Sequence, residues 1–333
     1  MNRNTSTSQP AADQLPGLLR TMLLIRRVEE RLRDDFHAGK LPGGVHLYIG
    51  QEAIAAGVCA HLNDDDWIAS THRGHGHFLA KGGDPGAMIA EIHGKETGIC
   101  RGMGGSMHVA DFSKGIIGAN GIVGGGVGIT VGAALAAQLE NRGQVAVCFF
   151  GDGAANQGVF MEALNVGALW KLPLVLVCEH NGFSEFSPSD TVTAGDIADR
   201  PRAFGIPSTS VDGNDALAVL EAAGVAVDHA RQGKGPSFLL ATTYRTHGHN
   251  EGEVYWLSGT YRDDSEIEEW NRRDPIDRLT RTLVVRGICT LDDVGAMDRE
   301  ILDAVEDACA FAEASPAPAP EAVRDLMFFD QAP

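Results

Sequence analysis

Two stretches of the 333-residue chain decide its fold: residues 144–153, QVAVCFFGDG, and residues 172–183, LPLVLVCEHNGF. Each opens with a continuous apolar run of the length of one buried strand and closes on polar residues and glycine. The segment between them, residues 157–170, has the pattern of a helix. Buried strands that alternate with helices predict an α/β fold with a doubly wound, mostly parallel sheet, whose ligands bind beyond the carboxyl ends of the strands.

The alternation of strands and helices continues on both sides of this centre. Further strands are predicted at residues 208–211 and 237–243, with a helix at residues 216–231 between them. Earlier helices are predicted at residues 15–36, 51–62, 84–94 and 128–139. An irregular polar loop is expected over residues 245–262, followed by two helices. One domain with helical extensions is therefore expected over residues 15–325, between a disordered tail at residues 1–14 and a second tail at residues 326–333.

The composition excludes several classes of function. Lys and Arg number 27 and Asp and Glu 45, which gives a net charge of -18. Such a charge repels nucleic acids and anionic membrane surfaces. The six cysteines form no Cys-x-x-Cys pair, so a zinc site or a disulfide framework is not expected. The N-terminus lacks the apolar core of a signal peptide and no run is long enough to span a membrane, so we expect a cytoplasmic protein.

The polar residues that end the two central strands point to a metal and phosphate site. Asp152 follows the first strand between two glycines, which let backbone amides approach phosphate oxygens. A carboxylate beside phosphates requires a hard cation between them, and Mg²⁺ prefers such oxygen ligands. Asn181 follows the next strand, with 27 residues between Gly153 and it, so its amide oxygen is expected at the same cation.

The spacing of Gly151-Asp152-Gly153 and Asn181 resembles the thiamin diphosphate motif. Five further stretches resemble one family in order and spacing: residues 46–52 HLYIGQE, 70–76 STHRGHG, 104–108 GGSMH, 118–124 GANGIVG and 244–249 YRTHGH. Together they resemble the alpha subunits of the first component of 2-oxo acid and acetoin dehydrogenase complexes. The resemblance extends over roughly residues 15–325.

This resemblance implies a role for each matching residue. The Mg²⁺ ligands would be Asp152, Asn181 and the carbonyl oxygen of Phe183. The diphosphate would contact His72, Arg73 and the backbone amides of Gly153 and Ala154. The backbones of Gly121 and Val123 would meet the aminopyrimidine ring. Arg245 would order the loop that carries His249 and contact phosphate, and His46 and His249 would face the reacting carbon.

The resemblance also implies partner chains. The carboxylate that activates the aminopyrimidine belongs to the beta subunit in this family, with Glu52 and Glu162 as the alternatives within this chain. We therefore expect a heterotetramer of two alpha and two beta chains. The acyl group would pass to a second, lipoyl-bearing acyltransferase component.

The substrate is predicted from two stretches that resemble the acetoin branch, residues 118–126 and residues 249–253. Acetoin or a related acyloin is therefore the expected substrate. A pyruvate or branched-chain 2-oxo acid dehydrogenase is the first alternative, and an acyloin-forming enzyme without a lipoyl partner is the second. The segment Val254–Thr260 lengthens the loop and adds Tyr255 and Trp256, which would either shape the substrate pocket or pack against the beta chain.

Two other classes of protein fit the sequence less well. A nicotinamide oxidoreductase has the same type of fold but requires Gly-x-Gly-x-x-Gly between the first strand and its helix. No strand predicted here is followed by that spacing. A non-catalytic scaffold subunit has no need of the intact Asp152 and Asn181 pair.

Overall fold

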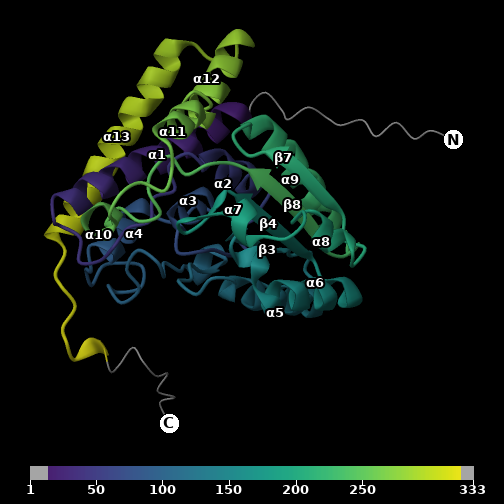
Figure 1. The fold of residues 1–333 in the computed structure, drawn as a ribbon. Helices are drawn as coiled ribbons and strands as arrows, with labels where there is room; N and C mark the ends of the chain where they lie inside the picture. The colour runs from purple at the N-terminus through teal and green to yellow at the C-terminus, as the bar shows by residue number, and fades with distance from the viewer. Residues whose placement is uncertain (1–13, 324–333) are drawn as a thin grey trace.

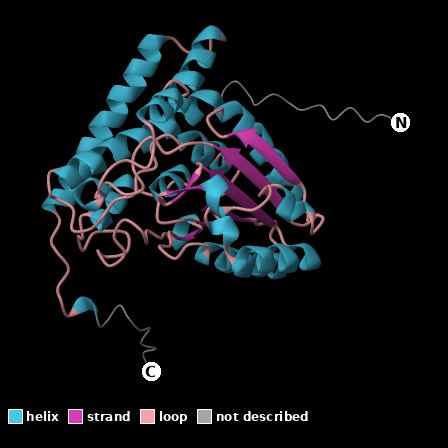
Figure 2. Cartoon of the chain, viewed as in Figure 1, coloured by secondary structure: helices cyan, strands magenta, loops and turns pink. Residues whose placement is uncertain are grey.

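A single parallel sheet forms the centre of the molecule, as seen in the computed structural model, which describes residues 14–323 (Figures 1 and 2). Its strand order is β2-β1-β3-β4-β8-β7, and every neighbouring pair is parallel. The strands are β1 (Trp67–Ala69), β2 (Ile116–Gly118), β3 (Ala146–Gly151), β4 (Leu174–His180), β7 (Ser208–Asp212) and β8 (Ser237–Thr242). The predicted parallel α/β fold is confirmed, and the expected tails lie, except for Gln14, outside the described residues.

The side chains of the two central strands alternate between two separate hydrophobic clusters. In β3, Val147 and Phe149 join one cluster, whereas Cys148 and Phe150 join the other. β4 repeats the pattern, because its even-numbered apolar residues pack with Cys148 and its odd-numbered ones with Val147. Successive side chains of a strand point to opposite faces, so a strand covered on both faces reads as an unbroken apolar run. That is why residues 144–153 and 172–183 were decisive.

Helices cover both faces of this sheet. One face carries α5 (Gly125–Glu140) and α6 (Gly158–Trp170), and the other is covered by α2 (Glu52–Cys59) and α9 (Ala216–Arg231). The long helix α1 (Leu15–His37) packs against α2 and the C-terminal helices. These helices begin and end within three residues of the predicted positions.

The remaining elements connect or cover this core. They are α3 (His75–Ala80), α4 (Pro85–Ile92), α7 (Ser189–Val192), α8 (Asp199–Arg202), the hairpin β5 (Phe183–Ser184) and β6 (Ser187–Pro188), and the short turns η2 (Phe112–Lys114) and η3 (Ala154–Asn156). Residues 253–314 form four helices: α10 (Glu253–Trp256), α11 (Asp264–Asn271), α12 (Pro275–Val285) and α13 (Leu291–Ala314). The prediction of two helices after an irregular loop was therefore wrong by one helix, and α10 lies within the predicted loop.

Capping and ion pairs fix α13 against the N-terminal helix. Thr290 and Asp293 form a capping box at the start of α13, which satisfies two free backbone amides. Arg27 on α1 donates two hydrogen bonds of 2.8 Å to Asp298 on α13.

In residues 14–323 no helix has both the length and the apolar character needed to span a membrane. All six cysteines are free thiols.

Candidate active site

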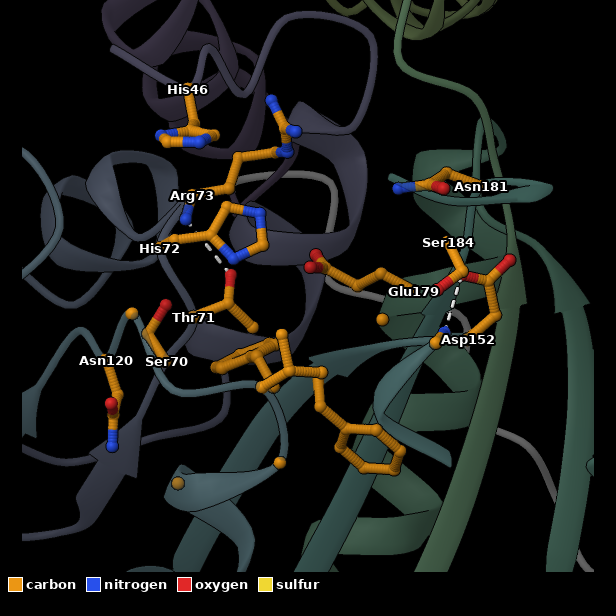
Figure 3. Close-up of a pocket in the computed structure, with 18 of the residues that line it drawn as sticks. His46, Ser70, Thr71, His72, Arg73, Asn120, Asp152, Glu179, Asn181 and Ser184 are labelled. Atoms are coloured by element: carbon orange, nitrogen blue, oxygen red, sulfur yellow. Dashed lines mark hydrogen bonds between the residues drawn. The ribbon is translucent and has the colours of Figure 1, made fainter. Parts of the chain in front are cut away.

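A cavity of about 340 Å³ lies at the carboxyl ends of β3 and β4. It collects residues from segments far apart in the sequence (Figure 3). The predicted residues that line it are His46, His72, Arg73, Gly121, Val123, Asp152, Gly153, Asn181, Phe183, Arg245 and His249. Only Ala154 of the predicted set does not line the cavity, because it is buried in η3 behind Gly153.

Asp152 is held at the end of β3 by the segment that follows β4. Its carboxylate accepts hydrogen bonds from the backbone amides of Gly153 at 2.9 Å and Gly182 at 3.1 Å. Nδ1 of His180 lies 2.9 Å from the same carboxylate, and that hydrogen bond raises the pKa of His180. The contact with Gly182 brings Asp152 next to the Asn181 segment, as the parallel strands predicted.

Asn181 joins the end of β4 to the start of α2. Its Nδ2 donates to Oε1 of Gln51 at 3.3 Å, and its Oδ1 accepts the amide of Phe183 at 3.2 Å. The amide is thereby oriented with its oxygen toward the turn that also carries Phe183. Figure 3 shows Asp152 and Asn181 on one side of the cavity and His46, His72 and Arg73 on the other.

Two buried arginines face this group. Arg73 donates to the backbone oxygens of Leu47 and, at 2.9 Å, of His249. Arg245 donates to the backbone oxygen of Glu185 and, at 3.3 Å, to the Tyr261 hydroxyl. Neither arginine forms a salt bridge within residues 14–323. Burial and the charge of Arg245 lower the pKa of Arg73 to about 9, and burial lowers that of Arg245.

Three histidines form one cluster beside the arginines. The ring centroids of His46, His72 and His249 lie 4.7 to 5.1 Å apart. Burial and the charge of Arg73 lower the pKa of His46 and of His249 to about 2 and lower that of His72 as well. Each ring offers a nitrogen within 4.8 Å of the others, but the two cationic arginines disfavour a second metal ion. A neutral histidine ring in this position has one nitrogen that donates a hydrogen bond and one that accepts a hydrogen bond.

The cavity contains buried nitrogen atoms that have no hydrogen-bond partner in the described chain. Buried polar atoms without a partner in the described chain include Nε2 of Gln51, Nδ1 of His46 and Nε of Arg245. All three residues line the cavity. A buried polar atom without a hydrogen-bond partner is unfavourable. We therefore expect a ligand with several oxygen atoms to supply the missing partners. With two unpaired arginines, the residues present fit an anionic group such as a diphosphate.

Gly153 brings the backbone close to the hairpin that follows β4. A Cβ atom at position 153 would lie 2.5 Å from Oγ of Ser184. A side chain at position 153 would therefore displace Ser184, so glycine allows the backbone to approach the hairpin this closely. The turn η3 lies between this glycine and α6, which begins at Gly158, one residue from the predicted start.

Sequence analysis missed several polar residues of the cavity. Gln51, Ser70 and Glu179 line it and were not assigned roles. Glu179 accepts a hydrogen bond from the Tyr48 hydroxyl and lies 3.0 Å from Nε2 of His77, whose Nδ1 is 2.7 Å from Ser70 Oγ. Gln51 and Ser70 fall within the quoted motifs, which was a usable signal. Glu179 lies within the quoted stretch 172–183, but its contacts with Tyr48 and His77 are tertiary and have no sequence signal.

The sequence of the chain matches a known protein family over most of its length. Residues 20–321 match the family model described as the dehydrogenase E1 component. The chain belongs to the dehydrogenase E1 component family. Membership in this family implies thiamin diphosphate as the cofactor, as the resemblance of the sequence motifs did.

Relatives within the dehydrogenase E1 component family cover nearly the whole chain. The chain is 48% identical over 311 residues to the alpha subunit of acetoin:2,6-dichlorophenolindophenol oxidoreductase from Cupriavidus necator, covering 93% of this chain and 92% of that protein. The subunit of the same name from Bacillus subtilis is also 48% identical, with coverages of 89% and 88%. The pyruvate dehydrogenase E1 component subunit alpha of Rhizobium meliloti is 39% identical, with coverages of 90% and 85%.

The structure bears on two alternatives that the sequence left open: an activating carboxylate within this chain, and a pocket shaped by the segment Val254–Thr260. Neither Glu52 nor Glu162 lines the cavity: Glu52 is buried in an ion pair with Arg26, and Glu162 lies on α6. The loop segment Val254–Thr260 does not line the cavity either. Trp256 packs instead against Phe186, with ring centroids 5.5 Å apart. The idea that this segment shapes the pocket directly receives no support, whereas packing against a beta chain stays a prediction.

Proposed function

We propose that the chain is the alpha subunit of a thiamin diphosphate-dependent dehydrogenase component that cleaves acetoin or a related acyloin and passes the acyl group to a lipoyl carrier. The two 48% identical relatives carry acetoin oxidoreductase names and match over about nine-tenths of the chain. These relatives support the assignment of the substrate. The residues that line the cavity support the assignment of the cofactor.

The observation that carries the cofactor assignment is the pair of buried arginines without carboxylate partners. Arg73 and Arg245 would neutralise the diphosphate, and the neutral His72 and the amides of Gly153 and Ala154 would donate hydrogen bonds to it. Asp152, Asn181 and the carbonyl of Phe183 would hold Mg²⁺ between the protein and the phosphates. These are oxygen ligands of the kind that Mg²⁺ selects. The backbones of Gly121 and Val123 would contact the aminopyrimidine.

The chain's own residues would orient the substrate through hydrogen bonds. Thiamin diphosphate, when bound, supplies the nucleophilic carbon that attacks a substrate carbonyl. His46 and His249 are neutral, so each ring could donate a hydrogen bond to substrate oxygen through its N–H and accept one at its other nitrogen. His46 is buried and His249 is half-buried, so a hydrogen bond from either ring to substrate oxygen would be stronger than one in bulk water.

A beta subunit would complete the site. Ile122 and Val123, on the aminopyrimidine side of the cavity, are 73% and 51% exposed. Two glutamates line the cavity: Glu185 is exposed, and Glu179 is engaged by Tyr48 and His77. The activating carboxylate would therefore come from the beta chain, in a heterotetramer of two alpha and two beta subunits. A lipoyl-bearing acyltransferase would act as the acceptor, and we expect the assembly in the cytoplasm.

A 2-oxo acid dehydrogenase is the second candidate. Alpha subunits named for pyruvate dehydrogenase are 39% and 41% identical to this chain. The same cavity serves both reactions, because the cofactor and the hydrogen-bonding groups are shared. The two candidates differ in substrate and are separated by assay.

The test is a dye-reduction assay with the chain co-expressed with its beta partner. Acetoin, pyruvate and 3-methyl-2-oxobutanoate are supplied in turn, with thiamin diphosphate and Mg²⁺ present. Acetoin-dependent reduction is the expected result, and reduction with a 2-oxo acid alone would replace the substrate assignment. Asp152→Asn should lose activity and Mg²⁺-dependent cofactor binding, whereas the exposed Asp190→Asn serves as the matched control. Full activity of Asp152→Asn would overturn the metal assignment.

A further inference from the structure

The side chain of Asn250 bridges its own loop and the segment that carries His46. Its Oδ1 accepts the backbone amide of Gly252 at 2.7 Å. Its Nδ2 lies 3.3 Å from Nε2 of His46. A backbone amide only donates, so the oxygen of Asn250 must face Gly252 and the NH₂ group must face the histidine.

The two segments are held in register independently of this contact. The amide of Glu251 donates to the backbone oxygen of Val45 at 3.0 Å, which joins the neighbours of Asn250 and His46. The carboxylate of Glu253 accepts the amide of His249 at 2.7 Å and so fixes the start of the loop. A Cβ atom on Gly44 would lie 2.7 Å from Nδ2 of Asn250, so the backbone of that segment packs directly on the amide.

A donor facing Nε2 decides where the proton of His46 resides. Burial and the charges of Arg73, His72, His75 and Arg245 lower the pKa of His46 to about 2, so the ring is neutral. A neutral ring that accepts at Nε2 carries its proton on Nδ1. That Nδ1 is buried and has no acceptor within residues 14–323.

We propose that Asn250 is a positioning residue that fixes the tautomer of His46, with the proton on Nδ1, so that the ring donates a hydrogen bond to the oxygen of the bound substrate. This role rests on the function proposed above. It explains the donor on Nδ1 without an acceptor, since the carbonyl or hydroxyl oxygen of an acyloin or a 2-oxo acid supplies one. It also gives Asn250 a role that an aliphatic side chain of similar size lacks.

The tautomer itself is the first measurement. The full chain is prepared with ¹⁵N-labelled histidine, and the His46 signals are assigned by their loss in His46→Gln. Nε2 is expected to have the shift of an unprotonated nitrogen and Nδ1 that of a protonated one. In Asn250→Asp the facing atom is an acceptor, so the proton should move to Nε2. A protonated Nε2 in the parent chain overturns the proposal, and this result does not depend on which substrate the complex uses.

Kinetics of the alpha–beta complex provide the second measurement. Asn250→Asp should lower kcat by about 10-fold or more, because a misplaced proton removes a general acid or donor. The groups that face His46 are His72, Arg73, His75, Arg245 and His249, so the new carboxylate should also raise the pKa of His46 and add an acidic limb to the pH profile. Asn250→Ala should lower kcat without that limb.

A double-mutant cycle separates tautomer control from a merely structural role. In the His46→Gln background, Asn250→Asp should cause no further loss of kcat, because its effect acts through His46. An equal loss in both backgrounds would mean that Asn250 only supports the loop, and would overturn the proposal. If acetoin proves inactive, the same cycle is measured with the 2-oxo acid that the complex turns over.

Discussion

Arg73 and Arg245 line one cavity, and each is buried without a carboxylate partner in the described chain. Burial and, after it, the charge of Arg245 lower the pKa of Arg73 to about 9, because both effects disfavour a cation removed from water. Uncompensated buried charges are unfavourable in the free chain. The same charges become favourable when a diphosphate binds between them. The two arginines would therefore lower the stability of the free chain and raise its affinity for the diphosphate.

Removing one of these charges should therefore change stability and affinity in opposite directions. Arg245→Met is expected to leave the free energy of unfolding unchanged or to raise it by about 1 kcal/mol, as replacement of buried charges by apolar groups often does. Affinity for thiamin diphosphate should fall about 10- to 100-fold, the value of one lost charge-assisted hydrogen bond. Urea unfolding and titration calorimetry measure the two quantities.

The exposed Arg142→Met is the control for Arg245→Met, and it should change neither quantity. A large loss of stability with unchanged cofactor affinity would show that Arg245 serves the fold alone.

The sequence predicts the centre of the sheet well because burial on both faces leaves an unbroken apolar run. β3, β4, β7 and β8 were all predicted within two residues at each end. β1 and β2 were missed, since each has three residues and lies beside acidic or glycine-rich turns. Their place in the sheet is set by pairing with neighbours, as in Ile68 with Ile116 and Val147.

The candidate site also contains residues that could be predicted from strand positions and residues that could not. Asp152 and Asn181 were predicted to lie close together because parallel strands end at one edge of the sheet. The histidine cluster came from a resemblance of motifs and not from any spacing, since His46 and His249 meet through tertiary packing. The bond from Asn250 to His46 spans 204 positions of the chain and has no local signal.

A methyl group on Gly153 should disturb the cavity wall. In Gly153→Ala the new Cβ would lie 2.5 Å from Oγ of Ser184 and 3.1 Å from its Cβ. We expect a loss of about 1–3 kcal/mol in the free energy of unfolding from this overpacking, together with weaker cofactor binding. Ser184→Gly in the same chain should restore most of both, because it removes the opposing atoms. Thermal unfolding and calorimetry of the two variants test this.

Gly158→Ala is the matched control for Gly153→Ala. A Cβ atom there would have no neighbour within 4 Å, and the residue lies in the first turn of α6. Alanine is the better helix former, so stability should be unchanged or slightly raised. Equal losses in both alanine variants would contradict the packing argument.

The aromatic residues of the loop should act on subunit association. Tyr255 and Trp256 are 69% and 59% exposed, and neither lines the cavity. Exposed aromatic anchors are typical of interfaces, so Trp256→Ala should weaken alpha–beta association by at least about 10-fold. The KM for substrate should change little in the assembled complex. Sedimentation analysis with Val285→Ala, an exposed apolar residue on α12, as control separates a local effect from a general one. A raised KM with intact assembly would contradict this.

The free chain should lose stability as the pH falls below about 6.5. The folded state holds His46 and His249 neutral with pKa values of about 2, whereas in the unfolded chain each titrates near about 6.5. Between these values the unfolded state binds more protons, so the free energy of unfolding decreases with decreasing pH. From about pH 7 to about pH 5.5 each ring should contribute a loss of about 1 kcal/mol.

Urea unfolding of the full chain at these two pH values measures that loss. His46→Gln and His249→Gln should each reduce the difference between the two pH values by about 1 kcal/mol, because glutamine does not titrate. Thr71→Ala alters the same cavity without removing a titrating group, so its effect should be equal at both pH values. If both histidine variants retain the full pH dependence of the parent chain, the two rings are not held neutral by burial, and the argument that they form hydrogen bonds to substrate as neutral groups fails with it.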